Sequence, residues 1–92
     1  MREKEVEQAL IAAVRKRGGL CLKFISPGWS GAPDRLVLFP GGKITFVELK
    51  APGRKPRPLQ VRRASQLRKL GFQVDIIDSK EKAAAYGGDA DA

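Results

Sequence analysis

The 92-residue sequence predicts an α/β fold in which about four short strands form one mixed sheet flanked by helices, in the order α-β-β-β-α-β. Two segments repeat apolar residues at three- and four-residue spacing, as amphipathic helices do. Two apolar runs of strand length are joined by Pro40-Gly41-Gly42-Lys43, a strong hairpin signal. We expect a single domain over residues 1–86 and a flexible tail over residues 87–92.

Charge and composition narrow the classes of function. The chain has 18 Lys and Arg against 10 Asp and Glu, a net charge of +8, which indicates a polyanionic partner such as nucleic acid. The lone Cys21 and the absence of histidine exclude an internal disulfide, a Cys/His zinc site and a His-dependent triad. Without a long apolar run or a signal-peptide pattern, we expect an intracellular, cytoplasmic protein that does not contact membranes.

The first predicted helix runs from residue 3 to about residue 17 and ends at Gly18-Gly19. Three acidic residues lie in or near its first turns, where negative charge complements the helix dipole. Glu7 also lies at the margin of the apolar stripe and could face a site. The buried stripe is expected to contain Val6, Ala9, Leu10, Ala13 and Val14.

Residues 20–25 alternate as a strand does, and residues 26–33 (SPGWSGAP) contain two prolines and two glycines, so they must form a loop. Trp29 lies at the centre of this loop. In a basic protein it could stack on a nucleic-acid base, or it could pack against its own domain. The sequence favours neither alternative.

Residues 35–39 and 44–49 are the two strands of the predicted hairpin, and apolar residues occupy both of their faces. We therefore expect helices to cover both sides of these strands. One face should contain Leu36, Leu38, Ile44 and Phe46, and the other Val37, Phe39, Val47 and Leu49.

The length of the turn determines which charged residues meet. A two-residue turn at Gly41-Gly42 would pair Phe39 with Ile44 and would place Asp34 opposite Leu49. A three-residue connection would pair Phe39 with Lys43 and bring Asp34 opposite Glu48. Lys50 would then lie on the same face as Glu48. A site shared by the two carboxylates requires the three-residue connection, and the glycines permit it.

The remaining segments continue the alternation of elements. Residues 51–58 form a proline-rich basic connector, and a helix with a strongly basic side begins near Pro58 and ends at Gly71. Residues 72–77 read as a strand, and Ser79 can cap a short helix that extends to about Tyr86.

Asp34, Glu48 and Lys50 suggest a site for phosphodiester hydrolysis, a reaction that divalent cations promote by activating water and neutralising developing charge. Mg²⁺ takes oxygen ligands, which two carboxylates and the carbonyl of Leu49 would provide. Lys50 would orient the attacking water or stabilise charge on the phosphate. Each residue alone also fits a structural role, Asp34 after a turn proline and Glu48 with Lys50 as an exposed pair. The combination is what indicates a metal site.

These residues resemble the PD-(D/E)xK signature of the restriction-endonuclease-like superfamily. The segments SPGWSGAPD, FVELKAPG, PLQ and LRKLGFQVDIID are similar to the VRR-NUC family of nucleases, and the resemblance covers about residues 3–80. It implies a restriction-endonuclease-like core that binds Mg²⁺ or Mn²⁺ through Asp34, Glu48 and the Leu49 carbonyl, with Lys50 catalytic. It also implies an acidic ligand in the first helix, for which both Glu3 and Glu7 remain candidates.

The same resemblance suggests further site residues and a substrate. Gln60 matches a glutamine that could contact the attacking water or a phosphate, although an early-helix polar residue needs no such role. Ser26 resembles a serine that precedes the motif loop in junction-resolving enzymes. Small phage members of the family are similar to Holliday-junction resolvases, which implies a homodimer acting on branched DNA, in the host cytoplasm if the chain is phage-encoded. Phosphate contacts would come from Arg54, Lys55, Arg57, Arg62 and Arg63.

The prediction is therefore a metal-dependent, structure-selective DNA endonuclease. A non-catalytic nucleic-acid-binding module would explain the charge and Trp29 equally well. A basic scaffold protein would explain the composition alone. Neither alternative accounts for acidic residues at the ends of apolar strands in a basic protein.

Overall fold

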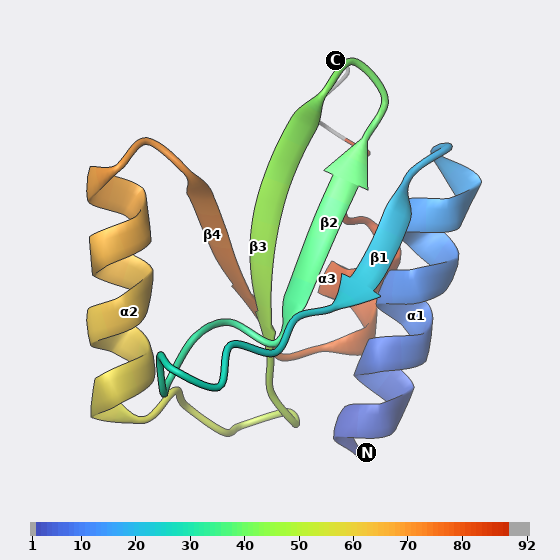
Figure 1. Cartoon of the computed structure of the whole chain (residues 1–92). Helices are drawn as coiled ribbons and strands as arrows, with labels where there is room; N and C mark the ends of the chain where they lie inside the picture. The colour runs from blue at the N-terminus through green and yellow to red at the C-terminus, as the bar shows by residue number, and fades with distance from the viewer. Residues whose placement is uncertain (1, 89–92) are drawn as a thin grey trace.

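A four-stranded sheet in the order β1-β2-β3-β4 organises the computed structural model, which describes residues 2–88 (Figure 1). The first three strands are antiparallel, and β4 lies parallel to β3 after the crossover through α2. The predicted mixed α/β fold is confirmed. The elements are α1 (Glu3–Lys16), β1 (Leu20–Lys23), β2 (Arg35–Phe39), β3 (Lys43–Leu49), α2 (Pro58–Lys69), β4 (Gln73–Ile77) and α3 (Lys80–Ala84).

The β2–β3 hairpin has the predicted three-residue connection. Phe39 pairs with Lys43, and the register continues to Arg35 opposite Val47. Gly41 and Gly42 have φ angles of 86° and 78°, which a side chain with a Cβ atom rarely adopts. The two glycines therefore permit the turn that sets this register.

One face of the sheet holds the main core. Helices α1 and α3 pack against this face, and its buried residues include Val37 and Val47, both fully inaccessible to solvent. The regular spacing of apolar residues in α1 places its stripe against the sheet, as predicted. The cluster consists of Val6, Leu10, Val14, Val37, Val47, Leu49, Ile77 and Ala83.

The opposite face is only partly covered, and the prediction that helices cover both sides of β2 and β3 is wrong for β2; β1 is also uncovered there. Helix α2 packs on Val74 of β4 together with Phe46 and Trp29, and not over the first two strands. Leu20 and Leu22 are 59% and 42% exposed. We call this the open face; its cross-strand neighbours are Leu20, Leu22, Leu36, Leu38, Ile44 and Phe46.

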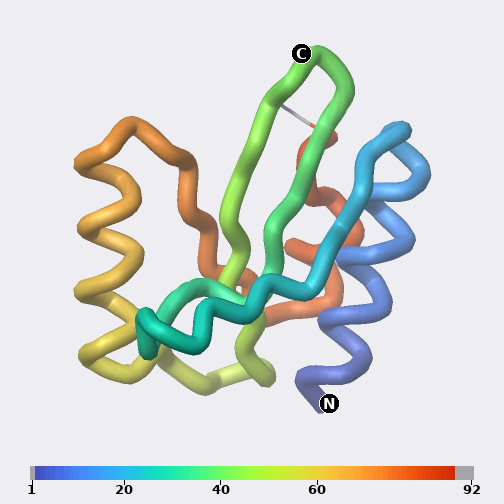
Figure 2. Tube along the Cα trace, in the orientation of Figure 1, coloured from blue at the N-terminus to red at the C-terminus, as the bar shows by residue number. Residues whose placement is uncertain are grey.

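Two irregular segments lie at the end of the sheet near the start of α1. Figure 2 shows the loop over residues 24–34 crossing this end, where the connector over residues 50–57 also runs. The β1–β2 pairing extends one bond beyond the strand, from the Phe24 amide to the Asp34 carbonyl at 2.9 Å. Strand β1 ends at Lys23 rather than Ile25, and Ile25 is 70% exposed.

The last helix ends at Ala84 rather than near Tyr86. Part-buried hydrogen bonds hold the Tyr86 side chain just after it. The Tyr86 hydroxyl lies 2.6 Å from the Asp75 carboxylate and 3.0 Å from the Thr45 hydroxyl. Burial, reinforced by Asp75, raises the pKa of Tyr86, so this group stays protonated and donates. Gly87 and Gly88, the first two residues of the predicted flexible tail, form a turn. Residues 89–92 lie outside the described residues.

None of the helices in residues 2–88 combines the length and apolar composition that crossing a bilayer requires.

Candidate metal centre and active site

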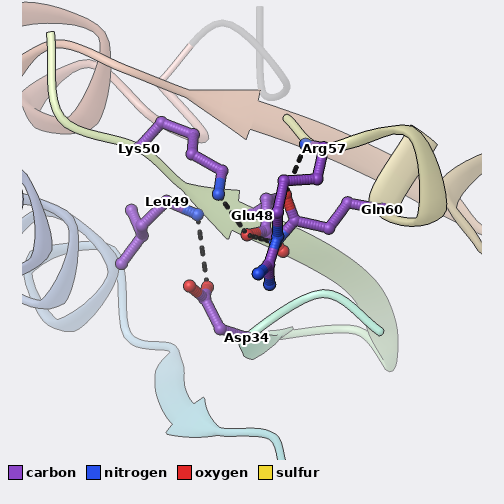
Figure 3. Close-up of polar contacts among 6 residues, drawn as sticks. All are labelled: Asp34, Glu48, Leu49, Lys50, Arg57 and Gln60. Atoms are coloured by element: carbon purple, nitrogen blue, oxygen red, sulfur yellow. Dashed lines mark hydrogen bonds and ion pairs between the residues drawn. The ribbon is translucent and has the colours of Figure 1, made fainter. Parts of the chain in front are cut away.

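Two acidic side chains lie together where β2 begins and β3 ends. Extending the observed register by one residue beyond Arg35–Val47 places Asp34 opposite Glu48. Both side chains project from the face that also holds Phe46, because side chains alternate along a strand. Figure 3 shows the two carboxylates, the Lys50 amine and the Gln60 amide converging on one region.

Both carboxylates hold protons more tightly than ordinary acidic side chains. Burial raises the pKa of Asp34 to about 6, against the opposing bond from the Leu49 amide. Burial and the negative charge of Asp34 raise the pKa of Glu48 to about 7, and the positive charge of Lys50 opposes this shift. Glu48 is only 5% exposed. Two carboxylates that repel each other in a poorly hydrated place favour a bound cation.

Pro33 explains why no amide of β2 faces the Leu49 carbonyl. The same register continued by two residues would set Leu49 opposite Pro33, which has no N–H group to donate to the Leu49 carbonyl. The Leu49 N–H donates to the Asp34 carboxylate, Oδ1, at 3.2 Å. Since the carbonyl of a strand residue points to the same side as its N–H, the Leu49 oxygen is directed toward β2 and Asp34.

The two oxygens of Glu48 have different surroundings. Oε2 accepts a hydrogen bond from the Gln60 side-chain amide at 2.8 Å and lies 3.5 Å from the Lys50 amine (Figure 3). Oε1 is buried, and within the described residues it has no hydrogen-bond partner. An unpartnered buried carboxylate oxygen is costly unless a ligand satisfies it.

These observations fit a hard divalent cation. The donor set would be Asp34, Oε1 of Glu48 and the Leu49 carbonyl, with water completing the coordination, as Mg²⁺ prefers. Across residues 2–88, no group of three or more acidic or Cys side chains is close enough to hold a metal ion by itself. The site therefore matches a cation that retains water, not one enclosed by protein ligands.

Comparisons with known proteins identify the family of the chain. No protein-family model matches the chain. A protein of Acyrthosiphon pisum secondary endosymbiont phage 1, named "Putative nuclease p44", is 53% identical over 81 residues, which span 88% of this chain and 87% of that protein. A solved structure described as a VRR_NUC domain superposes with a TM-score of 0.83 at 38% identity, over 88% of both chains. This chain belongs to the VRR-NUC family.

In this VRR-NUC chain the two acidic candidates of α1 have different environments. The Glu7 carboxylate pairs with the guanidinium of Arg35, whose side chain is only 11% exposed. The negative charge of Glu3 contributes to the raised pKa of both Asp34 and Glu48, so Glu3 is the acidic residue of α1 that acts on the site electrostatically. It also lines a cavity with Lys50. The partner of Glu7, Arg35, was not predicted from the sequence, although an arginine at the start of an apolar strand was a usable signal.

We predict that Glu3→Gln weakens Mn²⁺ binding and that Glu7→Gln does not. Glu3 adds negative charge beside the two carboxylates, whereas Glu7 neutralises Arg35. Loss of Glu7 should instead lower the free energy of unfolding by about 1 kcal/mol, because Arg35 would keep a largely buried charge without its partner. Calorimetric titration with Mn²⁺ and urea unfolding of both variants would measure the two effects. A larger loss of Mn²⁺ affinity in Glu7→Gln would reverse the assignment.

Basic residues of the connector border the site. Arg54, Lys55 and Arg57 line a cavity of about 410 Å³ together with Glu3 and Lys50. These three residues are all exposed at the surface, where a phosphate could reach them. Of the other predicted DNA contacts, Arg62 is exposed on α2, and Ser26 lies in the loop before Asp34, where its carbonyl accepts from the Trp29 amide.

Trp29 and Arg63 fix the loop of this VRR-NUC domain to helix α2. The Arg63 guanidinium lies 4.9 Å from the centre of the Trp29 ring and donates to the Ser30 carbonyl at 2.8 Å. The ring also packs against the buried cluster of Ala64, Leu67 and Val74. Of the two alternatives for Trp29, the structure shows packing within the domain. DNA contacts by Trp29 and Arg63 remain predictions.

Proposed function

We propose that this VRR-NUC chain is an endonuclease that hydrolyses phosphodiester bonds of DNA with Mg²⁺ or Mn²⁺, and that branched DNA such as a Holliday junction is its substrate. The observation that best supports hydrolysis is the buried pair Asp34 and Glu48, with one unpartnered Glu48 oxygen, beside Lys50. The name of the phage relative and the family of the solved structure support the same class of reaction.

Different residues of the chain would have different roles in the reaction. Asp34, Glu48 and the Leu49 carbonyl would hold the cation, which would supply an activated water and neutralise charge on the phosphate. Lys50 is 16% exposed and ion-paired with Glu48, so its amine is held at the edge of the site, where it can orient the water or donate to a phosphate oxygen. The connector residues bind flanking phosphates, which positions the backbone without reading its sequence.

Incubation of branched and linear DNA with Mg²⁺, Mn²⁺ or EDTA tests this function. We expect cleavage of branched DNA in either metal and none in EDTA. Binding without cleavage in both metals would contradict hydrolysis and favour a nucleic-acid-binding module. Equal cleavage of linear and branched DNA would contradict only the preference for branched DNA.

We further propose that the active form is a homodimer that associates through the open face. The residues of this face carry no charge, although the chain has a net charge of +8, so two copies can meet there without placing like charges in contact. The row Leu22, Leu36 and Phe46 directly precedes the row of Asp34 and Glu48. A two-fold dimer through this face would set the two sites side by side, as paired cuts in a symmetric junction require.

The variant Leu22→Glu tests the dimer, because it introduces charge into the open face at a residue that is 42% exposed. We expect the wild-type chain to be dimeric by light scattering and Leu22→Glu to be monomeric with its circular dichroism retained. Val61→Glu is the matched control, since Val61 is 51% exposed on α2, outside the sheet. A monomeric wild-type protein at micromolar concentration, or a dimeric Leu22→Glu, would contradict this interface.

A further inference from the structure

The side chain of Gln60 is held at both ends. Gln60 is the third residue of α2, and its carbonyl oxygen, Oε1, accepts from the main-chain N–H of Arg57 at 2.8 Å. Its amide nitrogen, Nε2, donates to Oε2 of Glu48 at 2.8 Å. Since Arg57 contributes a donor and Glu48 an acceptor, the amide can satisfy both only in this orientation. The N-terminus of α2 is thereby connected to the acidic pair through one side chain (Figure 3).

The contact determines which oxygen of Glu48 is available. Oε2 is occupied by Gln60 and faces Lys50, while the buried Oε1 lacks a partner among the described residues. We propose that Gln60, oriented by the main-chain amide of Arg57, is a positioning residue that directs Oε1 of Glu48 toward the metal. The proposal rests on the metal site of the proposed function. It gives Gln60 a role through Glu48 instead of a direct contact with water or phosphate.

A helix cap alone does not explain this arrangement. A glutamine three residues after the N-cap commonly accepts from the N-cap amide, and that uses only its oxygen. The nitrogen of Gln60 does not contribute to the cap, yet it makes the bond to the buried Glu48. Hydrogen bonds to a ligating carboxylate fix its orientation, and their loss typically weakens metal binding by about 10- to 100-fold.

The same link joins phosphate contacts to the metal site. Arg54 and Lys55 line the cavity beside Lys50, and Arg57 follows two residues later with its amide bonded to Gln60. A displacement of the connector would therefore move the Arg57 amide and, through Gln60, the Glu48 carboxylate. The role of Arg57 then lies in its backbone as well as in its guanidinium.

Two substitutions at one position separate backbone from side chain. Arg57→Ala and Arg57→Pro both remove the guanidinium, but only proline removes the N–H that orients Gln60. Proline fits here because Arg57 has φ −70° and ψ 157°. A third variant, Gln60→Met, keeps the length of the side chain and removes both hydrogen bonds.

The measurement is Mn²⁺ affinity of the full chain by calorimetry, with thermal unfolding of the metal-free protein in parallel. We expect Arg57→Ala to bind Mn²⁺ as wild type does, and Arg57→Pro and Gln60→Met to bind about tenfold or more weakly. Unchanged affinity in both, with only a lower melting temperature, would reduce Gln60 to a helix cap and overturn the proposal. If Gln60→Met fails to fold, the comparison of Arg57→Pro with Arg57→Ala decides. Failure of the wild-type chain to bind Mn²⁺ would instead contradict the proposed function itself.

Discussion

Asp34→Asn, Glu48→Gln and Lys50→Met should each reduce DNA cleavage by about a thousandfold or more while leaving DNA binding nearly unchanged. The amide replacements preserve shape but cannot offer the negative charge that holds a cation. Methionine keeps the aliphatic length of Lys50 without its positive charge. Binding should persist because, on the proposed function, the basic connector and α2 supply most of the affinity for phosphates. Single-turnover cleavage and a gel-shift titration of a branched DNA would measure the two quantities.

Asp78→Asn is a suitable control for these variants. Asp78 pairs with the exposed Lys82 at 3.1 Å, in the loop before α3, and belongs to neither the site nor the connector. Its replacement should leave cleavage within a few-fold of wild type. If Asp34→Asn retained cleavage within tenfold of the control, Asp34 could not be a ligand of the essential cation. Retained cleavage in Lys50→Met would remove only the catalytic role of the lysine.

The metal-free protein should lose stability as the pH rises from about 4 to about 7.5. The folded state raises the pKa of Asp34 to about 6 and that of Glu48 to about 7, above the ordinary values of 3.8 and 4.5. Between these values the folded chain binds more protons than the unfolded chain, so raising the pH favours unfolding. The stabilisation is complete below pH 4 and is lost through pH 6 to 7. Its size should be on the order of 3 kcal/mol for the coupled pair.

Urea unfolding at several pH values in EDTA measures this dependence. Mn²⁺ at pH 7.5 should restore the lost stability, because a cation that binds only the folded state stabilises it. Asp34→Asn should show a flatter pH profile and higher metal-free stability at pH 7.5, since the repulsion between the two carboxylates is removed. It should respond little to Mn²⁺, because the Asp34 carboxylate is no longer available as a ligand. Stability that increased with pH over this range, or a profile unchanged by Asp34→Asn, would contradict the origin of these shifts.

The position of the two carboxylates could be predicted from the sequence because strand pairing leaves few choices. A hairpin with two consecutive glycines allows either of two connections, and each connection assigns every side chain to a face. Only one of them brings Asp34 and Glu48 together, and the structure has it. That these residues bind a metal remains a prediction, because the register explains only why the two carboxylates lie close together.

The roles of Glu3, Glu7 and Gln60 could not be separated in the same way. Glu3 and Glu7 lie one turn apart on a helix, so both lie on the same side of it, and their assignment depends on how α1 sits against β2. The deciding contact, Arg35 with Glu7, joins residues 28 positions apart. The bond from Gln60 to Glu48 likewise depends on the crossover through α2, which local patterns do not specify.

What covers the open face could not be predicted from the sequence either. Apolar residues on both sides of β2 and β3 indicate that both sides are covered, but not by what. Helix α2 covers only the side near β4, and Leu20, Leu22 and Ile44 remain exposed. A pattern of apolar residues cannot distinguish a helix of the same chain from a second chain, because both remove the same surface from water.

The three-residue turn between β2 and β3 also limits how related chains can differ in length. Asp34 and Glu48 are fourteen positions apart, and they face each other because this separation is even. Lengthening both strands by one residue preserves the pairing, so relatives with an active site should vary this spacing in steps of two. A single inserted residue must be absorbed by a bulge or by a different turn, or the two carboxylates part. An odd separation between the two acids in a relative would thus indicate a bulge, a different turn or separated carboxylates.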